Sequence, residues 1–157
     1  MEMKRYLLET FTYNDHANKL VLTKMWEMRD PAGAVRFFSH LINSQYKWMA
    51  RIVRDSKAAA MDWWEPVYPF ADLEEKWNDN LGLWLAYIGE RSEEQMYEEK
   101  RFTGFDGCEW AAPLKDIALQ LNYHSIHHRA QIQSLIRAQG IEPEFIDYIG
   151  NVYRKLS

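Results

Sequence analysis

Residues 113–140 read PLKDIALQLNYHSIHHRAQIQSLIRAQG and contain three of the chain's five histidines. Apolar side chains recur in this stretch at spacings of three and four, which predicts an amphipathic helix with one face in a core. Pro113 suits the first turn of such a helix, and Gly140 supplies its C-terminal stop. The inward stripe consists of Leu114, Ile117, Leu121, Ile132 and Leu135.

The rest of the chain predicts three more helices of the same kind. A stop before Asp30-Pro31 ends the first, and Asp72 with Glu75 suggests a capping box at the start of the third. Asp106-Gly107 between aromatic residues predicts a short hairpin-like loop before the last long helix, and the tail allows one short helix. The expected ranges are 3–28, 32–56 and 73–95 for the helices, 96–112 for the hairpin region and 144–148 for the tail.

Length, composition and charge indicate a single domain that is all-α, a four-helix bundle spanning residues 1–157. The net charge of -4, with Lys and Arg scattered among acids, argues against nucleic acid and anionic membranes as partners. No apolar run approaches the roughly 20 residues of a membrane span. The single cysteine, Cys108, cannot form an internal disulfide, and the default expectation is a cytoplasmic protein.

The histidines of the 113–140 helix do not share one direction. On a helical wheel His128 lies in the middle of the apolar stripe, His124 about 40° away at its edge, and His127 about 100° away, outside it. Two imidazoles at positions i and i+4 can reach one metal ion. The alternative is a pair of core histidines that find ordinary hydrogen-bond partners.

Two further histidines lie outside that helix. His40 is at the edge of the apolar arc of the second helix, where a polar side chain can face the mouth of a pocket between helices. His16 lies opposite the apolar face of the first helix, so we expect it to face solvent. Spacing along the sequence cannot by itself bring His40 to the other two histidines.

Three motifs in order resemble those of the DinB-like superfamily of metalloproteins. They are YNDHAN at 13–18, SHLINSQYKW at 39–48 and LNYHSIHHRAQI at 121–132, and the tail at 143–148 is also similar. The resemblance implies a four-helix bundle in which His40, His124 and His128 hold a divalent metal such as Zn, Ni or Fe. It is also compatible with a homodimer. Ala130 stands where many relatives have Gly, and His16 where an aromatic residue is common.

An open metal position can hold a thiolate or a water molecule. Because some superfamily members transfer low-molecular-weight thiols, the resemblance implies a metal-dependent thiol transferase that acts on an unknown electrophilic small molecule. A metal-dependent hydrolase and a non-catalytic metal-binding bundle are the alternatives. Some relatives carry Glu where this chain has Ser125, which gives an apparent HExxH motif. Without that carboxylate, protease-like chemistry is disfavoured.

Several other residues have two readings each. Gln131 and Gln120 could orient a histidine ring or be exposed, and Asn18 within an apolar face needs a buried partner. Arg129 is expected at the surface or in a dimer contact. Cys108 and His127 are disfavoured as additional ligands. Tryptophans either line the pocket or pack in the core: Trp48, Trp63, Trp64 and Trp84.

Overall fold

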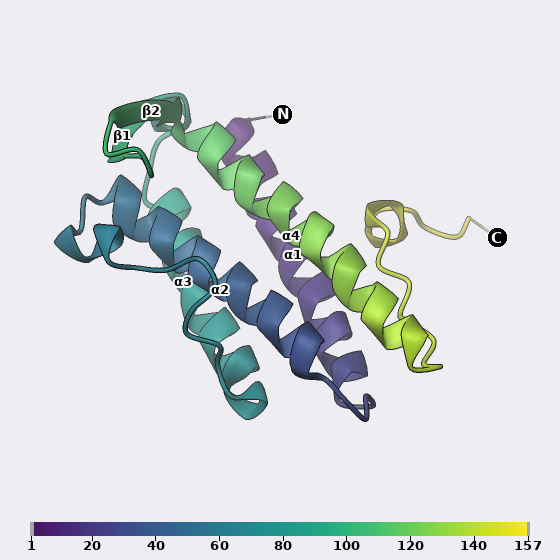
Figure 1. Cartoon of the computed structure of the whole chain (residues 1–157). Helices are drawn as coiled ribbons and strands as arrows, with labels where there is room; N and C mark the ends of the chain where they lie inside the picture. The colour runs from purple at the N-terminus through teal and green to yellow at the C-terminus, as the bar shows by residue number, and fades with distance from the viewer. Residues whose placement is uncertain (1, 157) are drawn as a thin grey trace.

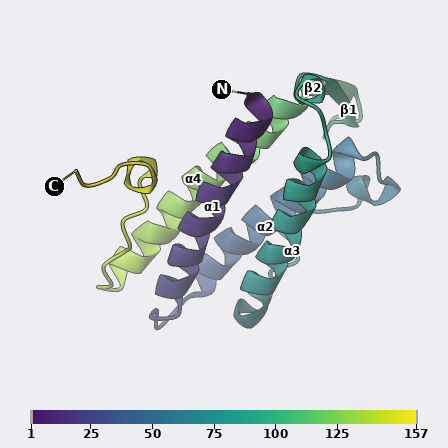
Figure 2. The same cartoon turned by 180° about the vertical axis from the view of Figure 1, so that it is seen from behind.

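Four long helices form the body of the protein in the computed structural model, which describes residues 2–156. They are α1 (Met3–Met25), α2 (Ala32–Ile52), α3 (Leu73–Gly89) and α4 (Leu114–Ala138). Helix α4 packs against both α1 and α2, and α3 packs against the same two helices (Figure 1). Seen from behind, α1 and α3 lie in front of α4 and α2 (Figure 2). The predicted all-α bundle is therefore confirmed.

A two-stranded antiparallel hairpin lies at one end of the bundle and precedes α4 (Figure 1). Strands β1 (Glu99–Thr103) and β2 (Glu109–Pro113) pair with Phe102 opposite Trp110. Gly107 in the turn has φ of 77°, a conformation that glycine adopts without strain. The Phe102 ring lies 4.9 Å from that of Trp48, so the hairpin covers the last turns of α2.

The first three helices are shorter than the sequence suggested. Helix α2 stops at Ile52 because Arg54 takes a left-handed conformation with φ of 57° and the Asp55 N–H returns to the Ala50 carbonyl. Helices α1 and α3 end at Met25 and Gly89 rather than at 28 and 95. The predicted stop at Gly140 is confirmed by its φ of 77°.

Two details at the helix ends were predicted wrongly. Asp72 belongs to a 3-10 turn, η2 (Phe70–Asp72), and its side chain caps no N–H of α3, so the capping box is absent. The short helix of the tail lies at η4 (Tyr148–Asn151), later than expected, where Tyr148 packs edge-on against Tyr13. Two further 3-10 turns are η1 (Ser56–Ala59) and η3 (Glu94–Met96).

The core consists of two apolar clusters separated by a polar layer halfway along the bundle. One cluster contains Phe38 and Trp77, and the other contains Phe11 and Trp84. Every helix contributes buried polar side chains to the layer between them, which also holds His40 and His128. The other members are Asn14, Asn18, Asn43, Ser44, Gln45, Asn80, Asn122, Ser125 and Arg129. The metal candidates thus lie beside a packed core that does not depend on them.

In the described part of the chain, every helix is too short or too polar to cross a bilayer.

Candidate metal centre

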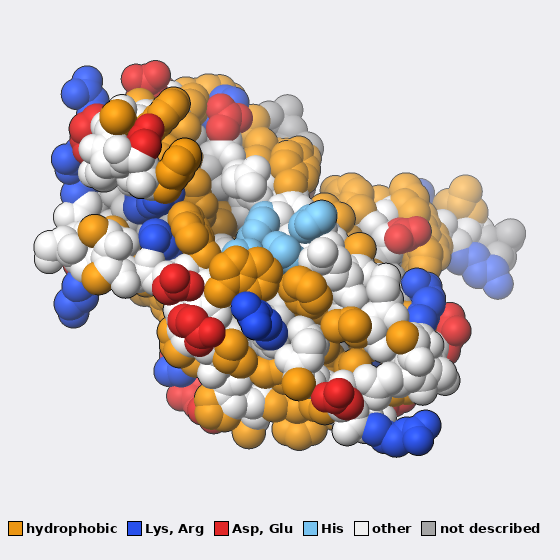
Figure 3. Space-filling model, viewed as in Figure 1, with side chains coloured by type: hydrophobic (Ala, Val, Ile, Leu, Met, Phe, Trp, Pro, Cys, Tyr) orange, Lys and Arg blue, Asp and Glu red, His pale blue; other side chains and the backbone are white. Residues whose placement is uncertain are grey.

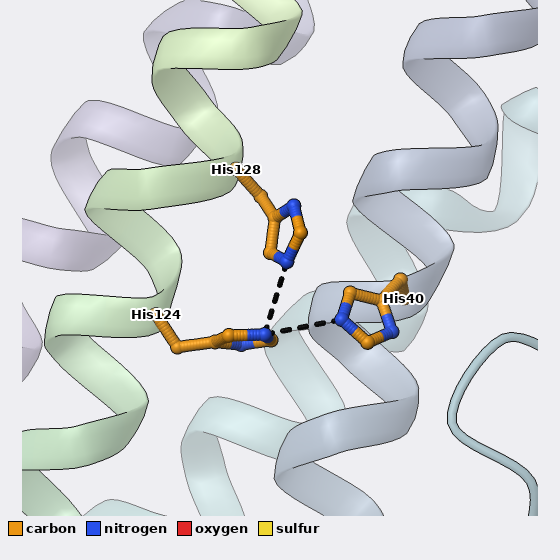
Figure 4. A group of neighbouring side chains, drawn as sticks. All are labelled: His40, His124 and His128. Atoms are coloured by element: carbon orange, nitrogen blue, oxygen red, sulfur yellow. Dashed lines mark hydrogen bonds between the residues drawn. The ribbon is translucent and has the colours of Figure 1, made fainter.

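Three histidines from two helices point toward one another at mid-bundle (Figure 4). His124 and His128 lie one turn apart on α4, and His40 faces them from α2. Nε2 of His124 lies 3.1 Å from Nε2 of His40 and 3.0 Å from Nε2 of His128. Ring nitrogens of all three lie within 4.8 Å of one another. The structure therefore brings together the three residues singled out in the sequence.

The separations of the His124 nitrogen from the other two suit a shared metal ion. Metal–nitrogen bonds of about 2.0–2.1 Å place two ligand nitrogens roughly 2.9–3.4 Å apart for bond angles between 90° and tetrahedral. Both Nε2 separations from His124 fall in that range. Among the described residues, the only cluster with this geometry consists of these three rings.

The protons of His40 and His128 are placed by acceptors on their far sides. Nδ1 of His40 donates to the carbonyl oxygen of Trp63 at 2.7 Å, and Nδ1 of His128 donates to the side-chain oxygen of Gln131 at 2.6 Å. A neutral ring with a proton on Nδ1 carries its lone pair on Nε2. Both rings therefore direct a lone pair toward His124, as metal ligands with outer hydrogen-bond partners do.

The surroundings keep the three rings neutral. Burial, followed by the neighbouring His128 and His40, lowers the pKa of His124 to about 4. Burial also lowers the pKa values of His40 and His128. The indole of Trp64 stacks on His40 with ring centres 3.8 Å apart, which shields one face of that ring. Neutral imidazole is the form that binds metal, so protons compete weakly for this site.

The site opens to solvent on one side. Figure 3 shows histidine side chains at the bottom of a hollow bordered by hydrophobic groups. A pocket of about 210 Å³ adjoins His40 and His124 there. Its other walls are Ser44, Trp48, Trp63, Gln120 and Leu121. A ligand entering this pocket would contact His40 and His124.

Some of the other residues considered in the sequence contact the histidines, and others are exposed or lie in the core. His16 and His127 are exposed, as predicted, and Cys108 is exposed in the hairpin and takes no part in the cluster. Gln131 orients His128, whereas Gln120 is an exposed residue at the pocket's edge. Of the four tryptophans, Trp48, Trp63 and Trp64 surround the histidines, and Trp84 is fully buried in the core against Phe11.

Arg129 is not at the surface, contrary to expectation. Only 2% of it is exposed, and its guanidinium donates to the side-chain oxygens of Asn14, Asn18 at 2.9 Å and Ser125 at 3.3 Å. The amide of Asn18 also donates to Ser125, which gives Asn18 the buried partner it was expected to need. Ser125 therefore faces α1 and not the histidines.

Comparison with known families agrees with this geometry. The sequence pattern of the DinB superfamily matches residues 37–132, which is more than half of the chain and includes all three clustered histidines. This chain belongs to the DinB superfamily. The match leaves out the first-helix motif and the tail, so the DinB resemblance noted there rests on the residues alone. Searches among curated proteins and solved structures return no match.

Two basic residues near the site were missed in the sequence. Lys47 and Arg51 follow His40 and Ser44 on α2 at spacings of four, three and four residues, which place all four on one face of the helix. Lys47 is 9% exposed and Arg51 is half-buried. The spacing could have identified both residues, because side chains on the same helix face as His40 are expected to line the same cleft.

Proposed function

We propose that the protein binds one divalent metal ion through Nε2 of His40, His124 and His128, with at least one coordination position left for a substrate. The observation that carries this proposal is the convergence of three neutral rings, two of which have their Nδ1 protons held by Trp63 and Gln131. Three imidazoles suit Zn, Ni or Fe. Three protein ligands with an adjoining pocket are typical of catalytic rather than closed structural metal sites.

The proposed reaction is transfer of a low-molecular-weight thiol to an electrophilic small molecule. A bound divalent metal lowers the pKa of a coordinated thiol, so that the thiolate is present at neutral pH. Trp48, Trp63 and Leu121 place apolar side chains in the walls beside the open coordination position. The new carbon–sulfur bond forms as the electrophile's leaving group departs with its bonding electrons.

The composition of the pocket favours thiol transfer over hydrolysis. A metal hydrolase commonly needs a carboxylate near the metal-bound water as a general base. Among the described residues, the walls of the pocket next to His40 and His124 include no Asp or Glu. Ser125, at the position where an HExxH glutamate would stand, is buried against α1. A thiol bound to the metal would release its proton to solvent at neutral pH and would need no such base.

Metal content tests the binding step. Purified protein should carry about one metal ion per chain by elemental analysis, and His40→Ala and His128→Ala should each lose most of it. His127→Ala is the matched control, because it removes an exposed histidine from the same helix. Full metal retention in both ligand variants would contradict the site.

Activity tests the reaction. Metal-loaded protein is incubated with 1-chloro-2,4-dinitrobenzene and, separately, with glutathione, cysteine and other small thiols. Thioether formation should depend on both the metal and His128. If no thiol gives a metal-dependent adduct and an ester is turned over without thiol, the hydrolase is favoured.

The possible homodimer and the cytoplasmic location stay predictions.

A further inference from the structure

A second and larger pocket adjoins the histidine pocket. It has a volume of about 490 Å³ and lies between the end of α2, the loop that follows it and the tip of the hairpin. Lys47, Arg51, Trp63 and Phe102 are among its walls. Figure 3 shows Lys or Arg side chains at this place, between the hairpin and the loop and next to the hollow with the histidines.

Two of the three cations of this pocket, Lys47 and Arg51, are held on aromatic rings. The Lys47 ammonium lies 4.6 Å from the ring centre of Trp63. The Arg51 guanidinium lies 4.8 Å from Trp63, 5.1 Å from Trp48 and 5.5 Å from Phe102. Stacking of this kind fixes the position of a cation without neutralising it. The pocket is therefore positively charged and already organised.

Neither cation has an acidic partner. Among residues 2–156, no carboxylate oxygen lies within 4.0 Å of Lys47 Nζ or of the Arg51 guanidinium, although other cations of the chain form such pairs. Lys47 donates to the Met61 carbonyl. Burial lowers the pKa values of both residues, which reflects the cost of holding these charges away from water. For Lys47, the Asp62 carboxylate offsets part of this decrease by raising the pKa from beyond ion-pair contact.

Two acids near these cations accept backbone N–H groups and form no ion pair with Lys47 or Arg51. Asp55, which lines the pocket, accepts the N–H of Lys57, and Asp62 accepts the N–H groups of Trp64 and Glu65. The third cation of the pocket, Arg54, pairs with Glu109 at 3.3 Å. Lys47 and Arg51 are thus the free positive charges of this pocket among the described residues.

Trp63 joins the two pockets. Its side chain is part of both walls, and its carbonyl oxygen orients His40. Trp48 likewise lines the histidine pocket while it stacks with Arg51. A molecule whose charged end contacts Arg51 can therefore extend along two indole rings toward His40 and His124. The stripe of His40, Ser44, Lys47 and Arg51 on α2 forms the floor of this path.

We propose that the Lys47–Arg51 pocket binds the oxyanion group, carboxylate or phosphate, of a small organic molecule whose flat apolar part lies against Trp63 and Trp48. The pocket would select substrates of the neighbouring histidine site, and only this last clause rests on the proposed function. Arg and Lys are suited to both oxyanions, with Arg able to form two parallel hydrogen bonds.

Binding of simple probes to metal-free protein tests the proposal without involving the metal site. Phenyl phosphate and benzoate represent the two oxyanions, inorganic phosphate lacks the ring, and benzyl alcohol lacks the charge. Dissociation constants are measured by calorimetry and by the fluorescence change of tryptophan. At least one of the two aromatic anions should bind at least tenfold more tightly than benzyl alcohol and than inorganic phosphate.

Variants locate the site. Arg51→Gln should weaken the better anion about tenfold or more, and Arg51→Lys should restore part of the affinity. Lys47→Gln should also weaken it, with circular dichroism as a check on the loop that its Met61 contact holds. Arg101→Gln, an exposed arginine of β1 outside the pocket, removes the same charge and should change nothing.

Three outcomes would overturn the proposal. They are equal affinity of wild type and Arg51→Gln, equal affinity for the anion and the alcohol, or no binding of either aromatic anion at 10 mM, on the order of the weakest specific affinities. Repeating the titration with His128→Ala separates this result from the proposed function. Retained binding in His128→Ala supports the anion pocket even if the metal assignment fails. A protein that binds metal but none of the aromatic anions would support the metal site and contradict the anion pocket.

Discussion

Nδ1 of His40 lies 2.7 Å from the carbonyl oxygen of Trp63, in the loop after α2, and this contact determines which nitrogen faces the other histidines. A carbonyl only accepts, so the proton of the neutral ring is on Nδ1 and the lone pair is on Nε2. The same loop carries the indole that walls both pockets. The loop thus orients the His40 ring and forms part of the walls of both pockets.

Gln131 should have the corresponding effect on His128. Gln131→Ala removes the acceptor of the Nδ1 proton and should weaken metal binding about ten- to a hundredfold, because outer hydrogen bonds fix the ring and its tautomer. Competition with a chromogenic chelator measures the affinity. Gln133→Ala is the matched control on α4, since Gln133 contacts the Glu144 carbonyl and not a histidine. An equal effect of both variants would refute the orienting role.

The stability of the metal-free protein should depend on His124 in mildly acidic solution. The folded-state pKa of His124 is about 4, below the ordinary value of 6.5, so the unfolded chain binds the proton more readily. The free energy of unfolding should therefore fall as pH drops from about 6.5 towards 4. His124→Gln cannot titrate, and its melting temperature should fall less between pH 7 and pH 5 than that of the wild type. Parallel curves would show that His124 does not contribute.

The sequence predicted the helices better than their ends. Apolar spacing identified all four helices, because each packs one face into a core. The end of α2 depends on a left-handed Arg54, a conformation for which arginine carries no sequence signal. Asp72 and Glu75 matched a capping box, but the chain before α3 forms a 3-10 turn that takes Asp72 out of the extended conformation a cap requires.

The site was predictable in part for a similar reason. One helical wheel shows His124 and His128 on one face, whereas His40 reaches them only through packing of α2 on α4, which the family resemblance supplied. Arg129 was misplaced because the wheel allowed one buried stripe. Helix α4 has neighbours on two sides, and a residue about 100° from the metal face points into the contact with α1.

Arg129 should matter for stability rather than for metal binding. Arg129→Ala leaves the side-chain oxygens of Asn14 and Asn18 buried with fewer donors and creates a cavity, so it should cost about 3 kcal/mol of unfolding free energy. Urea denaturation followed by circular dichroism measures this. Arg137→Ala, an exposed change on the same helix, should stay within about 1 kcal/mol. A loss of metal from an otherwise stable Arg129→Ala protein would be at odds with this assignment.

Metal removal should leave the fold intact, because both apolar clusters of the core close without the histidines. A ligand present at a hundredfold excess over its dissociation constant stabilises the native state by about 2.7 kcal/mol, which for a domain of this size is about 5–10 °C in melting temperature. Dialysis against a chelator should lower the melting temperature by that order and leave the helical circular dichroism signal unchanged. Readdition of the metal should restore it in the wild type but not in His128→Ala. Unfolding on chelation would instead indicate a closed structural site with a fourth protein ligand, which the cluster formed by residues 2–156 does not include.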